Sequence, residues 1–211
     1  GGERKRIFTR VIVGAEGRGS IVAKKMANQK MEPEHYSAGI RGYYKNVGGM
    51  PAQNYIELHF LKEFQPGYLW IFPLANGAAN VGVGMLSKNI SLKKVNLKQL
   101  MLEAIPTHPN LKSRVANATL EGTIEGWGLP LGSKKRKLSG NRFLLTGDAA
   151  SLMYPFTGEG IGNALVSALV APRTIINAIE ASDFTDRFLQ KYDEANYKNL
   201  WAKLNLRHYP N

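Results

Sequence analysis

The residues best suited to bind an electron-rich ligand lie within 141–166, NRFLLTGDAASLMYPFTGEGIGNALV. The apolar run 142–146 has the length of a buried strand, and Gly147-Asp148 ends it. A loop with Pro155 follows, and 158–160 (Gly-Glu-Gly) opens a run of small and apolar residues. The pattern therefore predicts a strand, an acidic turn, a loop and a helix.

Such an arrangement suits a flat, polar cofactor. A glycine-rich loop that enters a helix presents unpaired N–H groups and the positive end of the helix dipole. Gly158 and Gly160 lack a Cβ atom, so a ring could approach their backbone closely. Asp148 would follow the carboxyl end of a strand, where open α/β sheets place ligand-binding residues. Its carboxylate suits a polyol hydroxyl better than a phosphate.

A second group of residues could bind an apolar molecule. Tyr68, Trp70 and Phe72 alternate along the chain, so their three rings would project from one face of a strand. Pro73 follows them, and Gly82-Val83-Gly84 comes eight residues later. The rings would form a broad apolar wall. From periodicity alone, packing in the core of a sheet is the favoured explanation of these rings.

The elements around these residues fall into two kinds. Residues 6–20 read as a strand that runs into a glycine-rich turn, and 160–180 as a helix that kinks or restarts at Pro172. Residues 183–206 read as an amphipathic helix that packs on the domain, with contact between its lysines and anionic lipid as the alternative.

Between these flanks, alternation predicts an antiparallel meander over 35–47, 55–61, 68–74 and 79–85, with a tight turn at Asn76-Gly77. A helix over 91–105, capped by Ser91 and stopped by Pro106, is expected to cover part of this sheet. Residues 114–131 read as extended again.

Composition limits the classes of protein that fit. Of 211 residues, 44% are hydrophobic and none is cysteine, which excludes disulfides and Cys-ligated metals in this chain and fits a cytoplasmic location. No uninterrupted apolar run approaches the ~20 residues of a membrane span. The net charge of +12 would attract polyanions, yet only 134–137 (Lys-Lys-Arg-Lys) and the smaller 4–6 (Arg-Lys-Arg) form clusters. A solvated loop, a pyrophosphate site and an anionic membrane surface all fit these clusters, whereas no nucleic-acid motif surrounds them.

The run GDAASLMYPFTGEGI resembles the second flavin-binding motif of the p-hydroxybenzoate hydroxylase-like superfamily of FAD-dependent oxidoreductases. This resemblance implies that Asp148, after Gly147, binds the ribityl chain of FAD. It also implies that the loop and the helix start line the isoalloxazine ring, with these residues the candidates: Pro155, Thr157, Gly158, Gly160, Ile161.

Residues 14–20, GAEGRGS, are similar to a "GADGxxS" segment of the same superfamily. Glu16 and Gly17 are therefore expected near the flavin, although Glu16 replaces the usual Asp. A turn that needs glycine for its backbone conformation is the alternative.

The pattern YxWxFP followed by GxG resembles a signature of geranylgeranyl reductases. The resemblance implies that Tyr68, Trp70, Phe72 and Pro73, with Gly82 and Gly84, line an isoprenoid pocket. Tyr68 is the candidate catalytic residue as a proton donor. No metal is implied.

The resemblance covers only the last two thirds of a family member. The GxGxxG strand that binds the FAD pyrophosphate is missing, so we expect the chain to be a piece of a longer flavoprotein. The implied fold is α/β (α+β mixed). Parts of an FAD-binding Rossmann-like domain are expected at 1–32 and 132–182, an antiparallel-sheet substrate domain at 33–131 and a C-terminal helix at 183–211.

The implied function is FAD-dependent reduction of C=C bonds in a polyprenyl lipid, with NADPH or reduced ferredoxin as electron donor. A cytoplasmic protein with peripheral contact to anionic membrane is expected. Two alternatives stay open: a flavin-dependent monooxygenase or halogenase on the same scaffold, and a non-catalytic basic domain that binds membrane or a partner.

Overall fold

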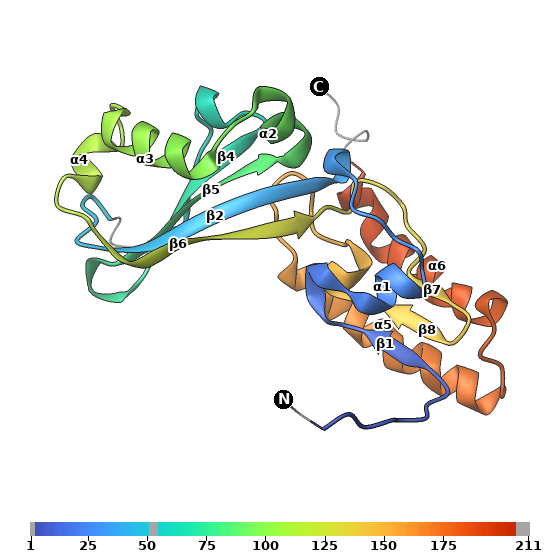
Figure 1. Cartoon of the computed structure of the whole chain (residues 1–211). Helices are drawn as coiled ribbons and strands as arrows, with labels where there is room; N and C mark the ends of the chain where they lie inside the picture. The colour runs from blue at the N-terminus through green and yellow to red at the C-terminus, as the bar shows by residue number, and fades with distance from the viewer. Residues whose placement is uncertain (1–2, 51–54, 206–211) are drawn as a thin grey trace. The chain divides into compact units, whose positions relative to one another are not determined.

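The computed structural model describes residues 3–50 and 55–205, and these residues form two compact units (Figure 1). One unit, here the discontinuous unit, comprises residues 1–35 and 130–211. The other, here the sheet unit, comprises residues 36–129. The division falls beside the boundaries expected after residues 32 and 131, and the last helix belongs to the discontinuous unit. The roles assigned to the units stay predictions.

The discontinuous unit is built on a three-stranded sheet with the order β1-β8-β7. β1 (Ile12–Gly14) runs parallel to β8 (Phe143–Leu145), and β7 (Ser139–Gly140) pairs antiparallel with β8. Gly14 must be glycine, because a Cβ atom there would lie 2.8 Å from the Leu145 side chain and 2.9 Å from Val22. The predicted strands are confirmed, although the first covers only three residues of 6–20.

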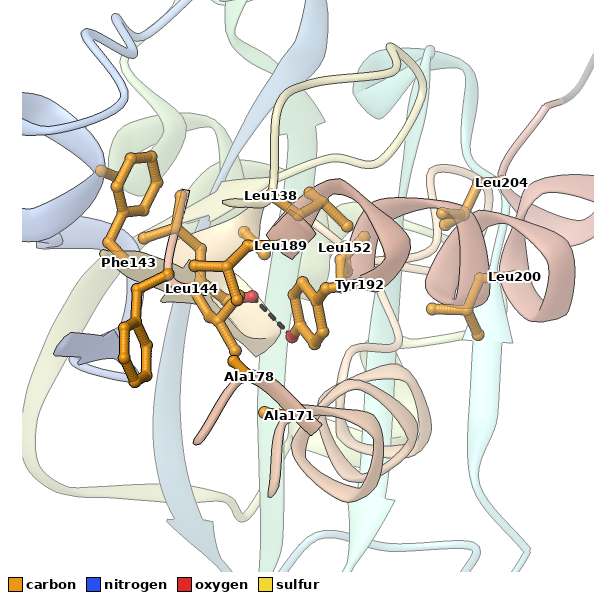
Figure 2. Close-up of a cluster of buried hydrophobic side chains, with 14 residues drawn as sticks. Leu138, Phe143, Leu144, Leu152, Ala171, Ala178, Leu189, Tyr192, Leu200 and Leu204 are labelled. Carbon is orange, nitrogen blue, oxygen red and sulfur yellow. Dashed lines mark hydrogen bonds between the residues drawn. The ribbon is translucent and has the colours of Figure 1, made fainter. Parts of the chain in front are cut away.

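Helices surround this small sheet. Their bounds are η1 (Gly17–Gly19), α1 (Ile21–Lys25), η2 (Pro33–His35), η5 (Gly147–Ala150), α5 (Ile161–Glu180) and α6 (Asp186–Leu204). α1, α5 and α6 contribute side chains to one core with β8 (Figure 2). The Tyr192 hydroxyl of α6 enters this core and donates hydrogen bonds to the backbone oxygens of Leu145, at 2.7 Å, and Ser167, at 3.2 Å. The expectation that the last helix packs on its domain is therefore confirmed.

The expected restart at Pro172 is wrong, because α5 continues as one helix of 20 residues, and the alternative of a kink stays a prediction. Pro172 and Ala168 are both exposed. Proline at position 172 leaves the Ala168 carbonyl without its N–H partner in the helix. Because both residues are exposed, water can hydrate this carbonyl, which lowers the cost of a proline inside the helix. Burial of Ala171, Thr174 and Ala178 holds the helix on both sides of the proline.

α5 bears on the expectation that no uninterrupted apolar run is long enough for a membrane span, which still holds for the sequence. By length and composition it is long and apolar enough to cross a membrane, a test that core helices of soluble proteins also pass. Single polar residues such as Asn163 and Arg173 divide the segment, so it contains no uninterrupted apolar run of that length.

The sheet unit contains a five-stranded sheet with the order β3-β4-β5-β2-β6. The strands are β2 (Tyr36–Lys45), β3 (Glu57–His59), β4 (Gly67–Pro73), β5 (Ala79–Leu86) and β6 (Thr119–Pro130). β4 and β5 form the predicted hairpin, and Asn76 and Gly77 of its turn η4 (Ala75–Gly77) have φ values of 59° and 68°. The four predicted strands and their antiparallel pairing are confirmed, but only β3, β4 and β5 form a meander. The expected pairing of the first strand with the second is wrong, because β2 pairs with β5.

Short helices cover one face of this sheet: η3 (Lys62–Phe64), α2 (Ser87–Lys93), α3 (Leu97–Thr107) and α4 (Lys112–Val115). Figure 1 shows α3 lying along this face of the sheet. Leu97, Met101 and Ile105 of α3 belong to the same buried cluster as Val81 and Val83 of β5.

The single helix predicted over 91–105 is in fact two. Lys94 adopts a left-handed conformation that ends α2, and the Asn96 side chain caps α3 by accepting a hydrogen bond from Gln99 N at 3.1 Å. Ser91 lies inside α2, and Pro106 lies in the last turn of α3 rather than beyond it. Part of the expected extended stretch 114–131 is α4 instead, so β6 begins at Thr119.

Candidate functional site

The first group of predicted site residues lies in the discontinuous unit, in the connection from β8 to α5. Asp148 follows the carboxyl end of β8, as predicted, and sits in η5. Gly147 adopts a φ of 54°, which favours glycine, and its N–H donates to the buried Ser167 hydroxyl at 3.0 Å. Because Ser167 lies on α5, this bond fixes the acidic turn against the helix.

Asp148 is half-buried, and burial raises the pKa of its carboxyl group. Among the described residues, none donates a hydrogen bond to this carboxylate. A half-buried acceptor of this kind fits a hydroxyl group of a bound ligand, which would restore the lost hydration.

The loop 154–160 is closed by its own backbone. Tyr154 N donates to the carbonyl of Glu159 at 2.7 Å, and Gly158 N donates to the carbonyl of Tyr154 at 2.9 Å. Gly158 has a φ of 71°, and a Cβ atom on Gly160 would lie 3.2 Å from Asp148 Oδ1 and 3.3 Å from Met153. The two glycines therefore let the loop fold back beside the carboxylate.

α5 begins at Ile161 and no side chain caps it, so its first N–H groups face the end of this loop. Ile161 is 78% exposed, whereas Pro155 and Thr157 are partly buried. A half-buried carboxylate, two glycines and an uncapped helix N-terminus can hold a group that has hydroxyls and an electron-rich edge, and the ribityl and isoalloxazine parts of FAD have both. These residues thus fit FAD, and their individual roles stay predictions.

Glu16 and Gly17 lie in the same unit, in the turn after β1. Glu16 Oε1 accepts a hydrogen bond from Val22 N at 3.1 Å, so it stabilises the start of α1. Partial burial favours a higher pKa for Glu16, but hydrogen bonds from the backbone outweigh it and the pKa is lowered. Gly17 has a φ of 76°, which accounts for the glycine. The turn thus has a structural role, and its proximity to flavin stays a prediction.

The four cationic side chains of the cluster 134–137 contact acidic or aromatic residues of their own unit. Lys134 and Arg136 lie 2.7 Å and 3.5 Å from the Glu32 carboxylate, and Lys137 lies 2.5 Å from Asp186. Lys135 lies over the rings of Tyr197 and Trp201. Because all four cations have partners, the cluster favours the interpretation as a surface loop over a pyrophosphate site.

The second group of site residues lies on the sheet unit. Tyr68, Trp70 and Phe72 project from the face of β4 opposite to Leu69 and Ile71, which are buried under the helices. The predicted alternation is therefore confirmed. Trp70 stacks on Phe72 with ring centroids 6.0 Å apart and an angle of 29°, and meets Tyr68 edge-on at 6.1 Å. We call these three rings the aromatic wall.

Gly82 and Gly84 of β5 lie directly opposite Trp70 and Tyr68 in the register. A Cβ atom on Gly82 would lie 2.3 Å from Trp70 Cζ2, so the indole lies across the backbone of β5 and requires this glycine. At Gly84 the nearest atom would be 3.6 Å away. Pro73 ends β4 and pairs with Ala79. The spacing of the GxG motif thus follows from the cross-strand position of the wall.

Three further residues of this surface were missed from sequence. Phe60 extends the wall, with its ring 5.8 Å from that of Tyr68. Gly39 of β2 lies under the edge of the indole, and Asn80 Oδ1 accepts a hydrogen bond from Trp70 Nε1 at 2.9 Å. For Asn80 a signal existed, because it shares its face of the strand with Gly82 and Gly84.

A pocket of about 150 Å³ lies on the other, helix-covered face of this sheet, lined by Tyr44, Val81 and residues of α3. It contains none of the predicted site residues. Among the described residues, no group of three acidic, His or Cys side chains is placed to hold a metal ion.

Comparison with known proteins identifies the class. A crystal structure of a geranylgeranyl bacteriochlorophyll reductase-like protein from Thermoplasma acidophilum matches with a TM-score of 0.77 and 26% identity, over 92% of this chain and 47% of that one. A flavin-dependent brominase matches with a TM-score of 0.72 and 19% identity, over 93% and 50%, which shows the fold alone. The fold is that of the FAD-dependent oxidoreductases.

Residues 36–121 match the family model "Geranylgeranyl reductase catalytic domain". The chain belongs to the geranylgeranyl reductase family of FAD-dependent oxidoreductases. A digeranylgeranylglycerophospholipid reductase from Thermoplasma acidophilum is 34% identical over 68% of this chain and 34% of its own length. One from Methanocaldococcus jannaschii is 30% identical over 98% and 52%. The chain spans about half the length, or less, of these curated relatives.

Proposed function

We propose that this chain is part of an FAD-dependent reductase that saturates C=C bonds in the prenyl chains of a lipid. The aromatic wall carries the proposal: it is an apolar surface of three rings on a glycine floor, and it lies within the residues that match the reductase catalytic domain. The relatives' names specify a lipid with geranylgeranyl chains, which such a surface suits.

In this proposal the wall binds and orients the hydrocarbon. Rings that lie side by side on a strand provide a broad contact for a branched chain and exclude water from it. A prenyl chain offers no hydrogen bonds, so its binding relies on this apolar contact, and its position relative to the reacting groups depends on how firmly the rings are held.

The loop 154–160 and α5 are assigned to the cofactor. When bound and reduced, FAD supplies the hydride for the C=C bond. Asp148 would accept a hydrogen bond from a ribityl hydroxyl, and the N–H groups at the start of α5 would stabilise negative charge at the edge of the ring. NADPH or reduced ferredoxin is the proposed source of electrons.

Saturation of one C=C bond adds a hydride to one carbon and a proton to the other. Tyr68 is the proposed proton donor. Burial raises the pKa of its hydroxyl, so the group carries its proton throughout the neutral pH range, as a donor must. Replacement of Tyr68 by Phe keeps the ring and removes the proton, so it should lower the rate more than the affinity for substrate.

A chimaera tests the proposed reaction. This chain replaces the matching part of the Methanocaldococcus jannaschii reductase, which supplies the rest of the length. With geranylgeranyl lipid and a chemical reductant, we expect a product heavier by two hydrogen atoms for each bond reduced, and loss of this product when Trp70 is replaced by Ala. A chimaera that binds FAD but forms a hydroxylated or halogenated product would instead support the monooxygenase or halogenase alternative.

The proposed location is the cytoplasm, with peripheral contact to an anionic membrane. The net charge of +12 and the lipid named for the relatives support it. Co-sedimentation with phosphatidylglycerol vesicles should fall steeply with added salt, because surface attraction is screened. Equal sedimentation with neutral vesicles would contradict an electrostatic contact.

A further inference from the structure

Asn80 occupies a special place beside the aromatic wall. It lies on β5, directly opposite Phe72 of β4 on one side and Tyr43 of β2 on the other. Its Oδ1 atom accepts the hydrogen bond of Trp70 Nε1 at 2.9 Å, diagonally across the β4–β5 pair. The amide is partly buried among these rings.

The bond fixes an indole that is already confined from below. The ring extends over three glycine positions, because added Cβ atoms at Gly82, Gly84 and Gly39 would lie 2.3, 3.6 and 3.5 Å from its carbons. Phe72 and Tyr68 limit it at its sides. Backbone and rings restrict the position of the indole, and the hydrogen bond to Asn80 selects its orientation, with the N–H directed toward β5.

This orientation determines the chemistry of the wall. An indole N–H is a donor only, and when it is left without a partner in an apolar site it favours ligands that bring an acceptor. Because Asn80 takes this donor, the Trp70 part of the wall presents hydrocarbon to a ligand, and the polar tip of the three rings is the Tyr68 hydroxyl.

We propose that Asn80 is a positioning residue for Trp70, and that it makes the wall specific for unsubstituted prenyl chains over hydroxylated ones. This inference rests on the proposed function, since it assumes that the prenyl chain binds at the wall. Asn80 acts through Trp70.

The test uses the 211-residue chain with Trp127 and Trp201 replaced by Phe, so that fluorescence reports on Trp70. Asn80→Leu removes the acceptor at similar volume, and Asn80→Asp keeps it. Gln99→Leu is the matched control, because it removes a 2.9 Å hydrogen bond to Glu103 on α3, on the other side of the sheet. The probes are the deoxy analogue of geraniol, which is a prenyl hydrocarbon without a polar group, and geraniol itself, which adds one hydroxyl.

The parent chain should bind the deoxy hydrocarbon more tightly than geraniol, the hydroxylated probe. Asn80→Leu should reduce this preference about tenfold, because a freed indole N–H rewards the hydroxylated probe and penalises the hydrocarbon. Asn80→Asp should restore the preference, and Gln99→Leu should leave it unchanged. Acrylamide should quench Trp70 more strongly in Asn80→Leu than in the parent.

An unchanged preference in Asn80→Leu would overturn the specificity role, and unchanged quenching would overturn the positioning role. If Gln99→Leu loses as much of the preference as Asn80→Leu does, the effect of Asn80 is a general effect on folding and the specific role is contradicted. If the parent chain binds neither probe, binding at the wall and the specificity built on it both fail, while the quenching comparison still decides whether Asn80 positions Trp70.

Discussion

Asp148 shows how a residue suited to a ligand can cost stability in the free chain. Because burial raises its pKa above the ordinary value of 3.8, its charged form is disfavoured in the fold. A raised folded-state pKa contributes stability below the unfolded pKa, and that stability is lost as pH rises through the folded value. The carboxylate is therefore unfavourable near neutral pH unless a donor such as a ribityl hydroxyl binds it.

Asp148→Asn should accordingly raise the melting temperature of the free chain near pH 7 and leave it nearly unchanged near pH 3, where Asp148 is protonated. Asp183 is the control with the opposite sign. Its pKa is lowered, chiefly by the hydrogen bonds from Thr185, so Asp183→Asn should not stabilise the chain at neutral pH. Scanning calorimetry at both pH values measures the two differences. Equal melting temperatures for Asp148→Asn and the parent at pH 7 would contradict a desolvated carboxylate.

Gly82 and Gly84 differ in the space that a side chain would find. Gly82→Ala forces a Cβ atom against Trp70 Cζ2 and against the Ile40 carbonyl oxygen at 2.4 Å, and overpacking of this kind costs about 1–3 kcal/mol. Gly84→Ala meets ordinary contact distances and should change stability by about 0.5 kcal/mol or less. Urea unfolding gives both values, and equal costs would show that the indole does not lie across β5 as described.

These residues show what sequence reasoning could reach. The alternation of Tyr68, Trp70 and Phe72 predicted a shared face because strand geometry alone decides it. The partnership of Asn80 with Trp70 depends on the register between two strands, which alternation within one strand does not define. The partners of residues 134–137 were equally out of reach, because Glu32 and Asp186 lie far from them along the chain.

Local sequence signals predicted the type of each element better than they predicted where it begins and ends. The apolar periodicity of 91–105 correctly predicted helix, but the break between α2 and α3 depends on Lys94 in a left-handed conformation and on the Asn96 cap. Apolar spacing passes over such a break, because the two helices present apolar residues to the same sheet. At Pro172 the sequence predicted a restart that the structure does not have. A proline on an exposed helix face is tolerated more easily than one in a core.

The cap gives a direct test of the boundary. Asn96→Ala removes the acceptor for Gln99 N and should cost about 1 kcal/mol of stability. Ser91→Ala, at the residue that the sequence pattern favoured as the cap, should change stability by about 0.5 kcal/mol or less, because Ser91 lies inside α2. Guanidinium unfolding of the two variants compares them. A larger loss for Ser91→Ala would mean that the helix starts where the sequence pattern placed it.

Considered as a whole, the chain leaves a long apolar helix face exposed. Ile161, Leu165, Leu169, Ile176 and Ile179 of α5 are each between 49% and 78% exposed, and spacings of three, four or seven residues place them along one side. Apolar patches of this extent usually mark contact with another molecule or segment. The chain also spans about half the length of its curated relatives.

The exposed side of α5 should therefore tolerate polar residues in this chain. Leu165→Ser combined with Leu169→Ser should change the free energy of unfolding by about 1 kcal/mol or less and reduce binding of a hydrophobic dye, because both side chains already face solvent. Leu189→Ser, at a fully buried position of α6, should cost about 3 kcal/mol or more. Similar losses for the double variant and Leu189→Ser would show that α5 is buried in solution.

The central claim is that the chain serves prenyl reduction, and anaerobic flavin spectroscopy of the chimaera tests it most directly. FAD bound to the chimaera is reduced chemically without oxygen, and geranylgeranyl diphosphate is then added. We predict that the visible absorption bands of oxidised flavin return, and that they fail to return when Trp70 is replaced by Ala. Bands that return only on admission of oxygen, with the prenyl compound unchanged, would contradict the account.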